Sequence, residues 1–129
     1  MKKCWLLWLT LLMLTACQSQ HNTLAADLQT VIQNPKLEKV ELTSMVEFDW
    51  QEAYLFPPYT QHNEITSTLG FPFSEQTNVT NSDNIYLLIF LHEDKIIESV
   101  DIHRAHCDFT IDSTKLTPDQ DTIYIQRYS

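Results

Sequence analysis

Apolar residues recur along the chain at two spacings, one typical of helices and one typical of strands. Near the start, three apolar residues lie four positions apart: Leu24, Leu28 and Ile32. This spacing puts them on one side of a helix, so residues 23–33 are predicted to form an amphipathic helix with Thr23 as its N-cap. Pro35 ends that helix, and a weaker helical pattern covers residues 36–42.

The middle of the chain predicts a strand followed by a helix. Residues 53–56 suit a short strand, which the two prolines after them stop. Thr60 is predicted to cap a helix that ends at Leu69. The only glycine of the chain, Gly70, comes next, and glycine is favoured just past a helix C-terminus. Residues 74–84 are rich in Asn, Ser and Thr and are predicted to form a loop.

The second half contains the strongest hairpin signal. Residues 85–91 form an apolar run and residues 96–102 a mixed one, with four polar residues between them. The first strand is apolar on both faces and is expected to be central, with the second strand outside it. Asp94 is expected to take the left-handed turn position, and residues 122–128 are predicted to form a last strand. The predicted fold class is α+β, with one or two helices packed on a small antiparallel sheet of three or four strands.

The N-terminus has the three parts of an export signal. Lys2 and Lys3 precede the apolar residues 4–13, and small residues follow. This apolar run is too short to span a membrane, which takes about 20 residues. The segment Leu14-Thr15-Ala16-Cys17 resembles the bacterial lipobox, in which a leucine and two small residues precede an obligatory cysteine.

This resemblance implies a lipid anchor. It implies removal of residues 1–16, diacylglycerol on the Cys17 thiol and, usually, acylation of the new amine. The alternative is an ordinary signal peptide with a chance cysteine, but Leu14 fits poorly at the −3 position of such a cleavage site. Several acyl chains give a stable anchor, whereas one gives only reversible membrane binding. The sequence therefore divides into a signal (1–16), a lipidated tether (17–23) and a single domain (24–129).

The mature chain would be strongly acidic. Loss of Lys2 and Lys3 with the signal leaves 6 basic and 17 acidic residues, a net charge of −11. Such a charge disfavours nucleic acid and anionic headgroups as partners, because both are bound through clustered Lys and Arg. A single glycine excludes the glycine-rich phosphate loops, and no cofactor is expected. Cys107 would be the only unmodified cysteine, predicted to be buried, with a free thiol as the alternative.

Two polar clusters are candidates for chemistry. His103, His106, Cys107 and Asp108 offer donor atoms that suit zinc or copper. On an extended chain the two histidines would face opposite ways, so a polar exit from the strand, with Cys107 or Phe109 turned inward, is the favoured interpretation. Asp49 and Glu52 could form a carboxylate pair of the kind used on glycans, although a solvated edge is more common. No catalytic residue is therefore assigned.

The aromatic residues that follow Asp49 also allow two interpretations. They follow one another within ten residues: Trp50, Tyr54, Phe56 and Tyr59. They are predicted to belong to the core, and the alternative is an exposed groove for a partner.

Parts of the chain resemble two groups of bacterial lipoproteins. Segments 50–60, 64–70 and 87–101 are similar to small envelope lipoproteins with an aromatic strand ending in Pro-Tyr-Thr, a short helix ending in Leu-Gly and a hairpin with an acidic turn. The stretch 59–72 is similar to outer-membrane assembly lipoproteins of the SmpA/OmlA type, which pack a helix-Leu-Gly-x-Pro unit on an antiparallel sheet. The hairpin turn here lacks the glycine usual in that group.

The function expected from these features is a non-catalytic envelope lipoprotein, a binding or assembly module held at a membrane through acylated Cys17. Its partner would be the bilayer and an envelope protein. Two alternatives are a metal-binding or enzymatic protein that uses residues 103–108, and an inhibitor-like domain. Gln18 is not the aspartate that favours inner-membrane retention, so a cell with two membranes would place the protein on the outer membrane, facing the periplasm. In a cell with one membrane it would lie on the plasma membrane.

Overall fold

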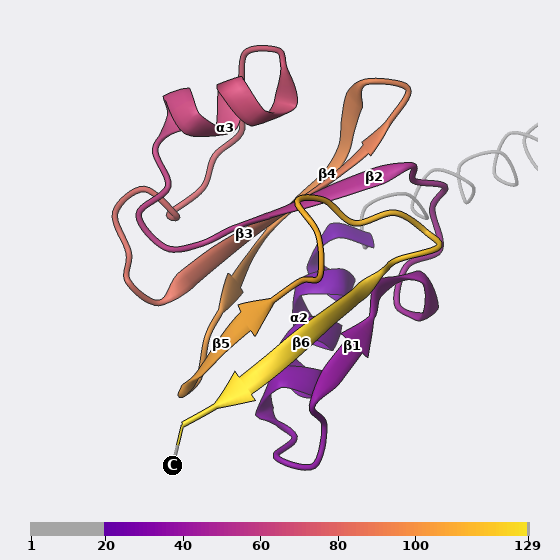
Figure 1. Cartoon of the computed structure of the whole chain (residues 1–129), viewed down its shortest axis with the longest axis vertical. Helices are drawn as coiled ribbons and strands as arrows, with labels where there is room; N and C mark the ends of the chain where they lie inside the picture. Colours follow the sequence, from indigo (N-terminus) through magenta and orange to yellow (C-terminus); the bar gives the residue numbers. More distant parts are fainter. Residues whose placement is uncertain (1–19, 129) are drawn as a thin grey trace, which may run out of the picture.

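The computed structural model describes residues 20–128, so the predicted signal, the lipobox and Cys17 lie outside the described residues. Helices and strands mix along the chain in an α+β fold, which confirms the predicted class (Figure 1). The elements are α2 (Gln20–Gln33), β1 (Lys39–Glu41), the 3-10 helix η2 (Leu42–Ser44), β2 (Glu52–Phe56), α3 (His62–Leu69), β3 (Ile85–His92), β4 (Lys95–His103), β5 (Cys107–Thr110) and β6 (Thr122–Arg127).

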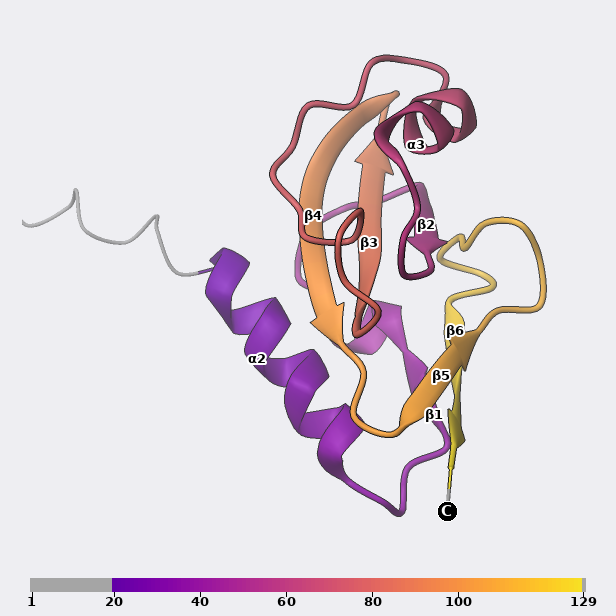
Figure 2. The same cartoon turned by 90° about the vertical axis from the view of Figure 1, so that its left-hand side faces the viewer.

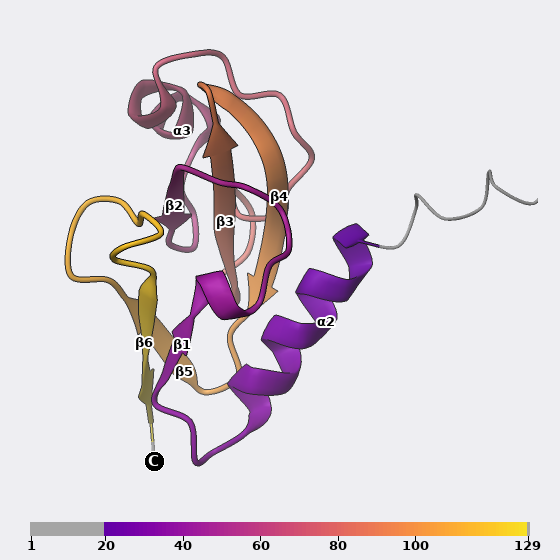
Figure 3. The same cartoon turned by 90° about the vertical axis from the view of Figure 1, so that its right-hand side faces the viewer.

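The strands form two antiparallel sheets of three strands rather than one sheet. The β1 sheet has the order β1-β6-β5, and the β3 sheet has the order β2-β3-β4. A pair of backbone hydrogen bonds between Ala53 of β2 and Leu116, each 2.8 Å long, connects the β3 sheet to the segment between β5 and β6. Figures 2 and 3 show that α2 and the β3 sheet both lie on the same side of the β1 sheet.

The β3–β4 hairpin agrees with the sequence prediction. Its strands pair from Ile85 opposite His103 to His92 opposite Lys95, so the loop between them has only two residues. These are Glu93 and Asp94, with φ angles of 50° and 61°. Two successive left-handed residues match the right-handed twist of the strands and make a tight hairpin turn. The left-handed position expected for Asp94 is confirmed, and Glu93 shares that conformation.

Helix α2 ends where predicted but begins earlier. It starts at Gln20, so Thr23 lies inside the helix and is not its N-cap, and four residues of the expected tether are helical. Its last turn contains no basic residue. Arg127 of β6 takes that role, because its guanidinium donates to the carbonyl oxygens of Ile32 at 2.8 Å and Asn34 at 2.6 Å. A cation at this end satisfies carbonyls that have no partner within the helix.

Helix α3 differs from the prediction only at its start. Gln61, rather than Thr60, is the N-cap, and it forms a reciprocal capping box with Glu64. The Thr60 hydroxyl donates instead to the Pro57 carbonyl at 2.6 Å. Gly70 ends the helix as predicted, with a left-handed φ of 86° and its N–H bonded to the carbonyl of Thr66 at 2.9 Å.

Two short strands correct the sequence interpretation. The helical pattern assigned to residues 36–42 is wrong, because the chain there turns, forms β1 and then enters η2. The alternation around Val40, which is buried between exposed Lys39 and Glu41, is the period of a strand. Strand β5 was not predicted at all. The last predicted strand is confirmed as β6.

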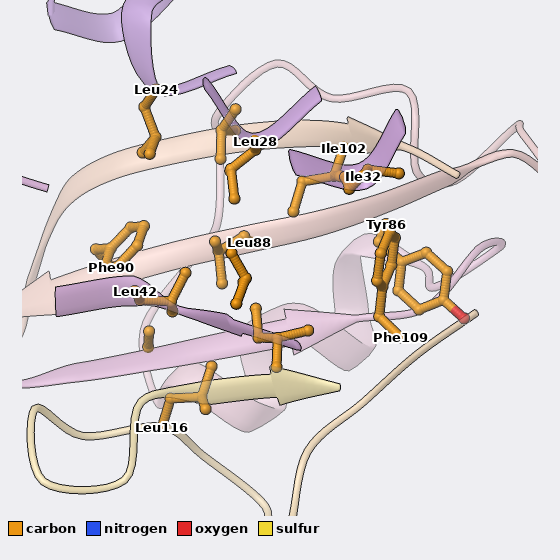
Figure 4. Packing of buried hydrophobic residues seen from close by; sticks show 14 of the residues in the cluster. Leu24, Leu28, Ile32, Leu42, Tyr86, Leu88, Phe90, Ile102, Phe109 and Leu116 are labelled. Carbon is orange, nitrogen blue, oxygen red and sulfur yellow. The ribbon is translucent and has the colours of Figure 1, made fainter. Parts of the chain in front are cut away.

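Strand β3 is the shared wall of two apolar cores, and its seven residues from Ile85 to Leu91 are buried. One face packs with α2, the β1 sheet and part of β4, and Figure 4 shows several of the buried side chains. This first core includes Leu24, Leu28, Ile32, Val40, Trp50, Tyr86, Leu88, Phe90, Ile102, Phe109 and Ile123. The other face packs with α3 and residues 71–84, and this second core comprises Phe56, Ile65, Phe73, Val79, Ile85, Leu87, Ile89 and Leu91. The central position predicted for β3 is thereby confirmed.

Candidate functional site

The candidate metal segment is the link that carries the chain from the β3 sheet to the β1 sheet. It turns sharply between β4 and β5, since His106 has a left-handed φ of 57°. Two backbone hydrogen bonds hold the link in place. The N–H of Arg104 donates to the Asn84 carbonyl at 2.8 Å, and the N–H of Tyr128 donates to the His106 carbonyl at 2.9 Å.

The side chains of this link point in different directions. His103 and His106 are exposed, whereas the Cys107 thiol is fully buried in the first core, as predicted. Phe109 is also buried, so the interpretation of this segment as a polar strand exit with inward Cys107 and Phe109 is confirmed. Within residues 20–128, no three His, Cys, Asp or Glu side chains are grouped so that they could hold a metal ion.

The Asp108 carboxylate is engaged in bonds within the domain. Its Oδ1 accepts a hydrogen bond from Arg104 Nη1 at 2.5 Å and one from the Tyr86 hydroxyl at 3.1 Å. The neighbouring carboxylate raises the pKa of Arg104, and burial raises the pKa of Tyr86. The Tyr86 ring also packs edge to face against the Phe109 ring, with the ring centroids 4.8 Å apart. Arg104, Asp108 and Tyr86 therefore tie β3 to β5, a structural role that leaves Asp108 poorly suited to bind a metal.

The proposed carboxylate pair is also divided between two environments. Asp49 is exposed, while Glu52 Oε1 accepts from Lys115 Nζ at 3.0 Å and Glu52 Oε2 from the Tyr54 hydroxyl at 3.4 Å. The hydrogen bond to Glu52 raises the pKa of Lys115, as expected for an ion pair. Trp50, between the two acids, is buried against Phe90 with ring centroids 5.3 Å apart. Glu52 thus holds Lys115 against β2 through their ion pair.

The aromatic residues of this region do not form one groove. Trp50 lies in the first core and Phe56 in the second, which confirms the core prediction for both. Tyr54 is half-buried against the second core. Tyr59 is 58% exposed and has a left-handed φ of 68°, so the core prediction is wrong for this residue. Its backbone is held by the bond from its N–H to the Val79 carbonyl at 2.7 Å.

One feature that the sequence prediction missed is an open groove beside β1, with a volume of about 500 Å³. Its walls come from the end of α2, the turn before β1, the strand itself and the end of η2. The residues are Val31, Lys36, Leu37, Glu38, Lys39, Val40, Glu41, Ser44 and Met45. Leu37 is 37% exposed there. The assignment of residues 36–42 to a helix hid this groove, and the alternation around Val40 was the signal that could have revealed it.

Compared with known families, curated proteins and solved structures, the chain matches none of them. The similarity to envelope lipoproteins therefore stays a prediction from the sequence. In the part of the chain that the structure describes, no helix is long and apolar enough to cross a membrane.

Proposed function

We propose that this chain is a lipid-anchored envelope protein whose folded domain is a non-catalytic binding or assembly module. The observation that carries the proposal is the lipobox Leu14-Thr15-Ala16-Cys17 and its distance from the domain along the chain. Only Gln18 and Ser19 separate Cys17 from the first residue of α2. Three residues span at most about 11 Å, so an acylated Cys17 would hold the start of α2 close to the membrane surface.

The packing of α2 supports the same arrangement. Its apolar residues Leu24, Leu28 and Ile32 are each no more than 4% exposed, because they pack into the first core. The stripe made by these three residues is therefore not available to enter the bilayer, and the acyl chains would supply the attachment. Because α2 is fixed to the rest of the domain, the whole domain would stand within a short distance of the membrane, where an envelope protein could meet it.

The candidate polar groups already form bonds within the domain, which favours a binding role over catalysis. Asp108 is bound by Arg104 and Tyr86, and Glu52 is bound by Lys115. The Cys107 thiol, fully buried, is shielded from solvent. The net charge of −11 for the mature chain disfavours nucleic acid and makes a protein partner the better proposal. If the source has two membranes, Gln18 favours the outer membrane, facing the periplasm.

The anchor is tested by replacing the lipobox cysteine in the full-length chain. Wild-type protein is expected in the membrane fraction with an acylated Cys17 as its N-terminus, as measured by mass spectrometry. Cys17→Ala is expected to lose the acyl mass and to be either released or retained with residues 1–16 still attached. Cys4→Ala is the matched control, because Cys4 leaves with the signal, and it should behave as wild type. A Cys17→Ala chain that is processed and membrane-bound like wild type would contradict the anchor.

The binding role needs a second experiment. Crosslinking in intact envelopes, followed by purification of the full chain, is expected to retain an envelope protein at a fixed ratio. Metal analysis of the same preparation distinguishes the alternative. Stoichiometric zinc that is lost in a His103→Ala/His106→Ala variant, with no crosslinked protein, would overturn the binding proposal in favour of a metal site.

A further inference from the structure

Strand β1 has one paired edge and one free edge. The N–H of Ile125 donates to the Glu38 carbonyl at 2.7 Å, and the N–H of Leu42 donates to the Asp121 carbonyl at 3.1 Å. In an antiparallel ladder the groups that face the partner alternate along the strand, so Val40 also faces β6. The N–H and C=O groups of Lys39 and Glu41 must then point away from β6. The Glu41 carbonyl is already engaged, because it accepts from Ser44 Oγ at 2.7 Å and Glu41 is the N-cap of η2. The outward groups that remain at this edge are the N–H and C=O of Lys39 and the N–H of Glu41.

The free edge of β1 lies along the groove described above. Its apolar wall is made by Val31 and Met45, which are half-buried, and by Leu37, which is 37% exposed. An open strand edge beside apolar side chains has the features of a strand-addition site, in which backbone bonds give affinity and neighbouring side chains give specificity. The edges of the β3 sheet are less suitable. At the outer edge of β2, Ala53 is paired with Leu116, and β4 contains a bulge near its hairpin.

The charges on β1 are complementary to those on a second, antiparallel copy of the same strand. Its sequence is Lys39-Val40-Glu41, and the side chains of Lys39 and Glu41 are exposed. An antiparallel copy of this strand, centred on Val40, would place Lys39 opposite the Glu41 of the second copy and Glu41 opposite its Lys39. These two pairs are also the positions whose backbone groups point outward, so in each pair the Glu41 N–H of one copy could donate to the Lys39 carbonyl of the other. Directly opposed unlike charges stabilise such cross-strand pairs.

We propose that β1 is a homodimerisation edge, where two copies of this chain pair antiparallel around Val40 to make one sheet of six strands. This inference goes beyond the proposed function and does not require the lipid anchor. The chain's own N-terminal tether is a poor occupant of the groove. Val31 lies in the last turn of α2, about 17 Å along the helix from Gln20, and residues 17–19 cannot span that distance.

The geometry of the pairing is compatible with one membrane. The two-fold axis of an antiparallel strand pair is perpendicular to the sheet, so both copies keep α2 on the same side of the joined sheet. Figures 2 and 3 show α2 on one side of the β1 sheet, where its apolar face joins the first core. Both copies of α2 would thus lie on one side of the joined sheet, as attachment to a single membrane requires. Three paired residues bury little surface, so the dimer should be weak in dilute solution and favoured when two chains share a membrane.

A charge exchange tests the proposal in the full-length chain, purified in a non-ionic detergent and measured by sedimentation equilibrium over a wide concentration range. Lys39→Glu and Glu41→Lys each create two like-charge pairs and are expected to weaken dimerisation by about tenfold or more. The double variant Lys39→Glu/Glu41→Lys restores both unlike pairs and is expected to dimerise as wild type does. Lys95→Glu, in the distant hairpin, makes the same charge change as Lys39→Glu and should have no effect.

Three results would overturn the proposal: a wild-type chain that is monomeric at every concentration, a dimer that neither single reversal weakens, and a double variant that stays as weak as the single ones. The circular dichroism of every variant should match wild type, since both side chains are exposed. A dimer that survives in Cys17→Ala separates this inference from the proposed anchor, because the β1 pairing does not use the lipid.

Discussion

The two cores on either side of β3 are closed by different kinds of structure. Over the first core lie a helix of 14 residues and the inner face of a second sheet. Over the second core lie a helix of eight residues and residues 71–84, which contain neither helix nor strand. Backbone hydrogen bonds of regular elements fix the first cover. In the second, only α3 is regular, and residues 71–84 are held by a backbone bond from Tyr59 to Val79 and by individual side-chain bonds. One strand therefore separates a core covered by regular elements from one whose cover is partly irregular, and we expect the second cover to shift more easily.

The side-chain bonds of the second cover can be named. The Asp101 carboxylate of β4 accepts a hydrogen bond from the Thr77 hydroxyl at 2.5 Å and one from the N–H of Asn78 at 2.8 Å. The Thr66 hydroxyl of α3 accepts the N–H of Phe73 at 3.1 Å. These contacts bring Phe73 and Val79 onto the outer face of β3, although the segment has no regular structure of its own. Such a loop is the place where local opening is expected to cost least.

Two neighbouring leucines of β3 give the sharpest test of this difference and the largest expected effect. Leu88 faces the first core and Leu87 the second, and both are fully buried. Leu→Ala at such sites costs about 2–5 kcal/mol, with the cost rising with the cavity that remains. We expect Leu88→Ala near the top of this range and Leu87→Ala nearer the bottom, because residues 71–84 can move into the space.

Urea unfolding followed by far-UV circular dichroism measures both values under the same conditions. The two substitutions remove the same atoms from adjacent positions of one strand, so each is the control for the other. An equal cost, or a larger cost for Leu87→Ala, would mean that the loop closes the second core as firmly as α2 and the β1 sheet close the first.

The next prediction concerns the bond that holds the second cover. Asp101→Asn replaces one carboxylate oxygen by an NH₂ group and loses the charge-assisted bond to Thr77 or Asn78, at a cost of about 1–2 kcal/mol. Hydrogen exchange should accelerate in residues 74–84 and remain slow in β1, β5 and β6. Asp49→Asn is the matched control, because Asp49 is exposed. Faster exchange throughout the domain would show that the two cores open together.

The same contrast explains what the sequence allowed us to predict. The hairpin, α3 with Gly70 and the apolar stripe of α2 depend on signals within about a dozen residues, and these elements were predicted correctly apart from their first residues. Strand β1 pairs with β6 across more than 80 residues of sequence, from Lys39 to Tyr124. No local pattern specifies that partner. The three residues of β1 are also too few for their alternation to compete with a helical interpretation, and the four residues of β5 are too few to stand out from a polar exit of the strand before them.

The candidate sites show the same limit. The positions of Cys107 and Phe109 followed from their apolar character, and both are buried. The role of Asp108 did not follow, because its hydrogen-bond donor Tyr86 is 22 residues away on another strand. Arg127 was likewise not recognised as the residue that binds the end of α2, since 95 residues separate it from Ile32. Polar residues are given their function by partners that the local sequence does not contain.

The smallest expected effect concerns pH and compares one tyrosine on each side of β3. Tyr86 belongs to the first core and Tyr54 packs against the second. Burial raises the pKa of both above the ordinary value of about 10, and the nearby Glu52 carboxylate adds to the rise for Tyr54. The folded protein thus holds these protons more tightly than the unfolded chain. The resulting stability is complete below pH 10 and is lost as the pH rises through the raised pKa values.

Tyr86→Phe and Tyr54→Phe each remove one ionisable group, so the loss of stability between about pH 9 and pH 11.5 should be smaller in each variant than in wild type. The change should be larger for Tyr86→Phe, because Tyr86 is only 7% exposed and its ring is enclosed by regular structure, whereas Tyr54 is half-buried. Urea unfolding at a series of pH values measures the slopes. The ion pair of Lys115 with Glu52 also titrates in alkali, but it is present in wild type and in Tyr86→Phe alike. Parallel curves for wild type and Tyr86→Phe would mean that the first core opens enough to let the Tyr86 phenol ionise in water, and that its cover is no firmer than that of the second core.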